Sequence, residues 1–150
     1  MGSLRLATYY QSRGDLEKAR KLSRQAIAFE PLNPEAYRLS AIQLHTSGDT
    51  VGALDALNEA LRLNPDLPLV HFNLGLLHAE LRDMDKAIYH LNATIRANPE
   101  FEDAWYNLIV LYWQIDQLPT ARTKLMEALK ALPNSQRLLQ LARQMPPSVN

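Results

Sequence analysis

Two asparagines, Asn73 and Asn107, are the residues whose type and spacing most clearly indicate a chemical task. They lie 34 residues apart, and each amide side chain offers hydrogen-bond donors as well as an acceptor. On one face of a protein, such amides can pair with the backbone of an extended peptide whatever its sequence. The task indicated is recognition. The alternative is that the two amides are solvated or cap neighbouring groups.

Groups that perform covalent or metal chemistry are scarce by comparison. The 150 residues include no cysteine, and the chain has no Gly-rich phosphate loop and no nucleophile motif. Its carboxylates are scattered instead of paired in an apolar pocket. The histidines, which show no tight cluster in the sequence, are His45, His71, His78 and His90. We therefore expect no enzyme activity, no catalytic residue, no cofactor and no metal site.

The charge balance and the apolar runs exclude two further classes. Lys and Arg total 16, as do Asp and Glu, so the formal net charge is zero. That balance argues against nucleic acid, whose binding depends on clustered cationic charge. No apolar run approaches the roughly 18–20 residues that span a bilayer, so no membrane insertion is expected. The compartment is unknown; we expect a soluble protein, with the cytoplasm slightly favoured.

The elements that must position the two asparagines follow from a strict repeat. Four prolines recur every 34 residues, and four alanines keep the same step. A period of about 20–50 residues indicates a stack of similar supersecondary units. The prolines are Pro31, Pro65, Pro99 and Pro133, and the alanines are Ala19, Ala53, Ala87 and Ala121.

Within each block the apolar residues follow helical spacing. Trp105, Leu108 and Tyr112 lie on one stripe of a first helix, and a second stripe follows a short break. Breaks such as Gly48-Asp49 predict a positive φ at the end of one helix and an Asp cap on the next. The recurrent proline ends the second helix. Each block is thus predicted to be a helical hairpin that buries its stripes only by stacking on neighbours.

Small residues are expected where the two helices of a hairpin approach each other. Ala7, Ala41 and Gly75 occupy the same position in three blocks, whereas Ile109 occupies it in the last. We therefore expect the last hairpin to be slightly opened. A row of alanines in the second helices has one exception, Thr94.

This pattern closely resembles the tetratricopeptide repeat family, whose 34-residue hairpins follow W-x2-L-G-x2-Y, then A, then P. The last block carries Trp105, Leu108, Tyr112, Ala121 and Pro133 at these positions, and the other blocks keep the alanine and the proline. The resemblance covers residues 3–145 and places His71 and His78 at packing positions. It implies an all-α fold, an α-solenoid of four stacked helix-turn-helix tetratricopeptide repeats with the first truncated, plus a C-terminal capping helix.

The blocks give the predicted domain organisation: a single array over residues 1–145, then a tail. The repeats are predicted at 1–33, 34–67, 68–101 and 102–135, the capping helix at 136–145 and the tail at 146–150. The capping helix should turn Leu138 and Leu141 onto the last repeat and leave Arg137 in solvent. Residues 1–3 are interpreted as a cloning remnant, and we expect the natural chain to extend further upstream.

The resemblance also implies a binding site. First helices of this family line a concave groove, and the positions facing it join the two asparagines to a row of apolar and aromatic side chains. Large apolar groups gathered on a surface mark interaction sites, and aromatic residues and Arg are common anchors. The alternative is that these side chains tuck between helices, as expected in part for Phe72. The predicted partner-binding residues are Arg38, Ile42, His45, Phe72, Asn73, Leu76, Tyr106, Asn107, Val110 and Trp113.

One subfamily grips the C-terminal carboxylate of heat-shock chaperones with a Lys/Asn/Asn/Lys/Arg clamp, and the match to it here is poor. Ile42 stands where an asparagine is needed, Asp103 where a lysine is needed, and Asn107 where the arginine is needed. We expect no carboxylate clamp.

The leading interpretation is a non-catalytic protein–protein interaction scaffold that binds an extended peptide or a helix of a partner protein. One alternative is structural self-association as a homo-oligomer, and another is a regulatory segment of a larger protein. A third is RNA binding, as in the related pentatricopeptide arrays; the 34-residue step and zero net charge count against it.

Overall fold

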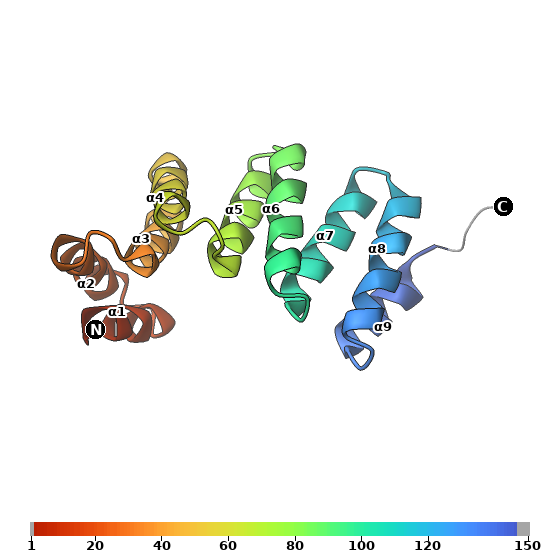
Figure 1. Cartoon of the computed structure of the whole chain (residues 1–150), viewed down its shortest axis with the longest axis horizontal. Helices are drawn as coiled ribbons and strands as arrows, with labels where there is room; N and C mark the ends of the chain where they lie inside the picture. Colours follow the sequence, from red (N-terminus) through yellow and green to blue (C-terminus); the bar gives the residue numbers. More distant parts are fainter. Residues whose placement is uncertain (1, 147–150) are drawn as a thin grey trace.

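Within residues 2–146, the part that the computed structural model describes, the chain forms nine α-helices and no strand. The helices pair into hairpins that stand side by side in one row, with the N-terminus at one end and the C-terminus at the other (Figure 1). They are α1 (Gly2–Ser12), α2 (Leu16–Phe29), α3 (Pro34–Thr46), α4 (Thr50–Leu63), α5 (Pro68–Glu80), α6 (Met84–Ala97), α7 (Glu102–Gln114), α8 (Leu118–Ala131) and α9 (Gln136–Gln144). The predicted all-α solenoid is confirmed.

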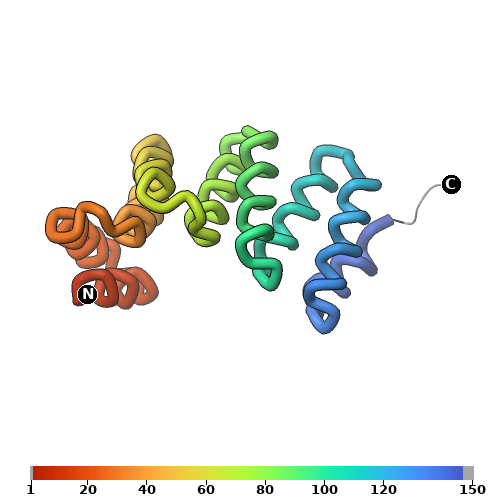
Figure 2. The backbone as a smooth tube through the Cα atoms, viewed as in Figure 1, coloured from red at the N-terminus to blue at the C-terminus, as the bar shows by residue number. Residues whose placement is uncertain are grey.

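Each predicted block contains one hairpin, and α9 lies where the capping helix was expected. The first two hairpins are seen closer to end-on than the next two, so the hairpins turn along the row (Figure 2). Leu138 and Leu141 of α9 are buried, as predicted. Met1 and residues 147–150, which include most of the predicted tail, lie outside the described residues.

The turns inside the hairpins share one backbone conformation. Gly14 and Gly48 adopt φ angles of 76° and 85°, and Arg82 and Asp116 occupy the same region at 63° and 60°. Only glycine takes this conformation without steric penalty, which for other residues is about 1–2 kcal/mol. The recurrence in four hairpins shows that the turn geometry, more than the residue type, is required.

Aspartates begin three of the second helices. The Asp49 carboxylate accepts a hydrogen bond from the backbone N–H of Gly52 at 2.9 Å. Asp15 and Asp83 do the same for the backbone N–H groups three residues on, at 3.3 and 3.4 Å. Each bond satisfies a donor that has no partner within the helix, so the predicted caps are confirmed. Gln117 makes no such bond for α8.

The recurrent prolines accept a hydrogen bond at each junction between hairpins. In α3, α5 and α7, the fourth residue of the block donates from its side chain to the carbonyl oxygen of the preceding proline. The bonds run from Tyr37 Oη to Pro31 O at 3.1 Å, from His71 Nε2 to Pro65 O at 2.9 Å, and from Trp105 Nε1 to Pro99 O at 2.8 Å. Three different side chains thus make the same connection.

Two clusters of the apolar core meet at α5. Val70, Leu74 and Leu77 on one side of α5 join buried residues of α3 and α4. Phe72 and Ala79 of the same helix pack against the second cluster, which α6, α7, α8 and α9 form. α5 is therefore the helix that links the two halves of the array.

Small residues set how closely the helices pack. A Cβ atom added to Gly75 would lie 2.9 Å from Cγ of Leu91, so α5 and α6 are in close approach there. α7, which carries Ile109 at that position, packs less closely on α8, and the predicted opening of the last hairpin is confirmed. The buried exception Thr94 is tolerated because its hydroxyl donates to the backbone oxygen of His90 at 3.0 Å.

Gly75→Ala tests this close approach. Alanine favours a helix by about 1 kcal/mol, but overpacking a dense core costs about 1–3 kcal/mol, and Leu91 is fully buried. We expect the free energy of unfolding, measured with urea, to fall by about 1–2 kcal/mol. Gly2→Ala is the control, since nothing lies within 4 Å of its added Cβ. Unchanged stability of Gly75→Ala would show that α5 and α6 separate freely.

Candidate partner-binding site

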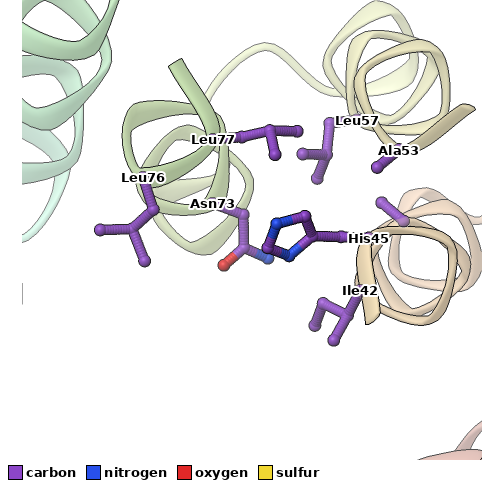
Figure 3. Close-up of a pocket in the computed structure, with 8 residues that line it drawn as sticks. Ile42, His45, Ala53, Leu57, Asn73, Leu76 and Leu77 are labelled. Carbon is purple, nitrogen blue, oxygen red and sulfur yellow. The ribbon is translucent and has the colours of Figure 1, made fainter. Parts of the chain in front are cut away.

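A cavity of about 220 Å³ lies where α3, α4 and α5 meet. Its wall is mostly apolar, and Figure 3 shows side chains from all three helices around it. α3 and α5 approach each other less closely here than α1 and α3 do. The lining residues are Ala41, Ile42, His45, Ala53, Leu57, Asn73, Leu76 and Leu77.

Asn73 supplies the polar feature of this cavity. Its side-chain nitrogen Nδ2 is buried and has no hydrogen-bond partner among the described residues. A buried donor without a partner costs about 1–3 kcal/mol. Because less than 1 Å² of Nδ2 is exposed, an acceptor in the cavity would recover that free energy only once the Asn73 side chain turns toward it.

His45 and Glu80 join α3 to α5 beside the cavity. His45 Nε2 lies 2.7 Å from Glu80 Oε2, and because a carboxylate only accepts, the imidazole donates from Nε2. Both side chains are exposed, so the pair contributes at most about 1 kcal/mol. The pair connects the C-terminal ends of the two helices.

Asn107, the second predicted amide, is engaged differently from Asn73. Its Nδ2 donates to the backbone oxygen of Asp103, one turn earlier in α7, at 2.7 Å. One of its donors is therefore committed to its own helix, whereas Nδ2 of Asn73 is unpaired. The two asparagines are equivalent in the sequence but not in the structure.

The predicted apolar row is divided between the two halves of the array. Ile42 is half-buried and Leu76 is 38% exposed, and both line the cavity. Val110 and Trp113 are half-buried and pack against the C-terminal core cluster.

Phe72 and Arg38 are more occupied than the remaining predicted residues. The Phe72 ring lies 4.9 Å from the ring of Phe101, so it tucks between helices as expected in part. Arg38 forms a two-pronged ion pair with Glu35 of the same helix, at 2.7 and 2.5 Å. Its side chain is only 13% exposed. Neither residue presents a free anchor.

Tyr106 is half-buried because the capping helix reaches over it. The guanidinium of Arg137 lies 3.7 Å from the centre of the Tyr106 ring and also pairs with Asp103. Arg137 is exposed as predicted, but it is engaged by these two side chains. α9 thereby covers part of the predicted surface on α7.

The structure corrects one expectation from the sequence, because three histidines do lie together. His71 and His78 of α5 meet His90 of α6, and Nδ1 of His71 lies 2.9 Å from Nδ1 of His90. The sign of this cluster in the sequence was that His71 and His78 occupy packing positions of the block that also contains His90. Among residues 2–146, no group of three or more His, Cys, Asp or Glu side chains is placed to hold a metal ion.

Comparisons with known proteins agree with this architecture. A family described as TPR repeat matches residues 43–81, and one described as tetratricopeptide repeat matches residues 72–136. The chain belongs to the tetratricopeptide repeat family. This fold generally mediates protein–protein interaction, and its members are typically non-catalytic scaffolds. A comparison with curated protein sequences finds no match.

Several solved tetratricopeptide repeat structures resemble the array. MamA superposes with a TM-score of 0.79 at 24% identity, covering 87% of this chain and 77% of MamA. TTC0263, a thermophilic TPR protein in Thermus thermophilus, gives 0.79 at 23% identity, covering 94% and 78%. YrrB, described as having an unusual peptide-binding site, gives 0.75 at 21% identity, covering 91% and 71%. At these identities the likeness establishes the fold alone.

The length and hydropathy of the helices decide whether any of them could cross a membrane. No helix in the described part of the chain is both long and apolar enough to cross a bilayer.

Arg137→Ala tests whether the capping helix is fastened through Tyr106. A cation over an aromatic ring contributes about 0.5–1 kcal/mol at an exposed site, so we expect a loss of that size in the free energy of unfolding. Amide hydrogens of α9 should exchange faster. The control is Arg143→Ala, which removes an exposed side chain from the last turn of the same helix. It should change neither the free energy of unfolding nor the amide exchange of α9. Equal effects of the two variants would remove the role assigned to Arg137.

Proposed function

We propose that this array binds an extended peptide segment of a partner protein over the cavity between α3, α4 and α5. The observation that carries the proposal is Asn73, a buried donor without a partner in an otherwise apolar wall. An apolar group alone would leave that donor unpaired. A peptide supplies both parts, an aliphatic side chain for the cavity and an adjacent backbone carbonyl for Nδ2.

The size of the cavity supports a side chain as its occupant. Its 220 Å³ is below the roughly 300–1,000 Å³ of ordinary small-molecule pockets. Ile42 and the exposed Leu76 extend the apolar surface on either side of the cavity. His45 is already paired with Glu80, so the lining has no free cation to attract an acidic group.

The predicted surface on α7 supports an extended peptide. Val110 and Trp113 are half-buried, with part of each side chain exposed one repeat beyond the cavity. A peptide anchored at the cavity would reach them in an extended conformation. Asn107 retains an acceptor oxygen there that can receive a backbone N–H group.

Asn73→Ala tests the hydrogen bond on which the proposal depends. Peptides selected from a displayed random library against the unaltered protein would be titrated by calorimetry. We expect Asn73→Ala to weaken binding about five- to tenfold, as for one neutral hydrogen bond of about 1–1.5 kcal/mol.

Asn107→Ala is the matched control, because it removes the same side chain one repeat away where Nδ2 is committed to Asp103. It should change affinity less than Asn73→Ala does. Failure to select any peptide, or equal effects of the two substitutions, would contradict the proposed site.

Self-association is the second candidate function, and one observation favours it. Phe29, which ends α2, and Leu32, in the connection to α3, are 82% and 76% exposed. Large apolar side chains that lie together in solvent mark an interaction surface. Burying them against a second copy would remove this apolar area from water.

Light scattering across a dilution series tests self-association. We expect a dimer at high concentration that Phe29→Ser/Leu32→Ser converts to a monomer, with Val51→Ser, at another exposed apolar residue, as the control. A monomer at every concentration would exclude this function while leaving the peptide site unaffected.

A further inference from the structure

The third repeat replaces its packing residues with histidines. At the fourth, eleventh and twenty-third positions of the other complete blocks stand aromatic, aliphatic or long polar side chains. The second block has Tyr37, Leu44 and Ala56, the third has His71, His78 and His90, and the fourth has Trp105, Tyr112 and Lys124. Among the complete blocks, only the third therefore closes its hairpin with imidazole groups.

Hydrogen bonding restricts the protonation of the first two histidines. His71 Nε2 lies 2.9 Å from the carbonyl oxygen of Pro65, which can only accept, so the proton is on Nε2. Nδ1 of the neutral ring is therefore an acceptor, and Nδ1 of His90, 2.9 Å away, must donate to it. One proton lies between the two nitrogens. With both rings charged, two N–H groups would face each other and the bond between α5 and α6 would be lost.

The third histidine increases the penalty for charging. The His78 ring is stacked parallel to that of His90, with centroids 5.6 Å apart and 4° between the planes. Nδ1 of His78 is buried without a hydrogen-bond partner. Two positively charged rings in this stack would repel each other.

We propose that His71, His78 and His90 form an acid-sensitive latch, in which the single proton shared by His71 and His90 keeps α5 and α6 closed and protonation of both rings opens them. The latch is independent of the proposed peptide site. It bears on that site because α5 carries Asn73 and also links the two core clusters. Opening the hairpin would disturb the cavity wall.

The charged side chains beside the three histidines do not supply a negative charge that would balance protonated imidazoles. Asp83, in the turn before α6, lies 3.6 Å from Nδ1 of His78 but is bound to Lys86 at 2.8 Å. That bond holds the pKa of Asp83 below its usual range. Burial lowers the pKa of His78, opposed by the attraction of Asp83, while Lys86 lowers it further.

On the side of the α4–α5 connection, the histidine pair borders an open notch. Asp66, Tyr89 and Arg96 line it together with His71 and His90. The Tyr89 ring meets His90 edge-on at 5.0 Å. The notch therefore places one carboxylate and one guanidinium at the pair, again with no excess of negative charge.

Burial, with contributions from the other two histidines and Lys86, lowers the pKa of His90 to about 4. In the unfolded chain a histidine titrates at about 6.5. Between these pH values His90 is protonated in the unfolded state but not in the folded state. The contribution of His90 to the free energy of unfolding is therefore fully present above about pH 6.5 and is lost as the pH falls towards 4. At about pH 5 this histidine alone lowers the folding equilibrium constant about thirtyfold.

The test compares urea unfolding at about pH 7.5 and about pH 5. The unaltered protein should lose at least about thirtyfold in its folding equilibrium constant, the share of His90 alone. The triple variant is His71→Tyr/His78→Tyr/His90→Ala, and its new residues are ones that other repeats carry at these positions. Its folding equilibrium constant should fall much less between the two pH values. His45→Gln removes the one histidine outside the cluster and should retain the full loss. If the triple variant lost as much stability at low pH as the unaltered protein, the effect would come from carboxylates, and the latch would be overturned.

Nuclear magnetic resonance of the imidazole nitrogens in the unaltered protein provides a second readout, which needs no variant. The expected result is a His90 proton on Nδ1 and a titration near 4, with α5–α6 amide exchange rising over the same range. Titration of His90 near 6.5 with exchange unchanged would overturn the proposal.

Discussion

The hydrogen bond from the fourth side chain of a block to the preceding proline carbonyl is the constraint on which the array depends. It ties the first helix of one hairpin to the connection that follows the hairpin before it, at 2.8 to 3.1 Å. Tyr37, His71 and Trp105 all satisfy it with different chemistry. An inserted residue between donor and proline would misplace the bond, so it fixes the separation of 6 residues that all three junctions share.

Features set by residues at equivalent block positions could be predicted from the sequence because each has a local cause. Asp49 caps its helix through the next turn, and Gly75 allows a close approach that Ile109 prevents. The cavity could not be predicted, because it depends on the separation of α3 and α5, a result of packing across the whole junction. Asn73 and Asn107 were indistinguishable for the same reason, since only the fold decides which amide finds a partner.

The histidine cluster could be predicted only in part from the sequence. His71 and His78 were assigned to packing positions, and their burial agrees with that assignment. Their meeting with His90 required the pairing of α5 with α6, which the hairpin prediction already contained. The ring orientations that join two Nδ1 atoms were not accessible, because side-chain rotamers follow from packing on both helices.

The division of the core at α5 has a consequence for how the chain folds. The two clusters are joined through the two sides of one helix. Stability in stacked repeats is approximately a sum of each repeat and its interfaces with its neighbours. Cooperativity between the two ends must therefore pass through α5. Folding in such a stack can begin in any repeat and propagate to its neighbours.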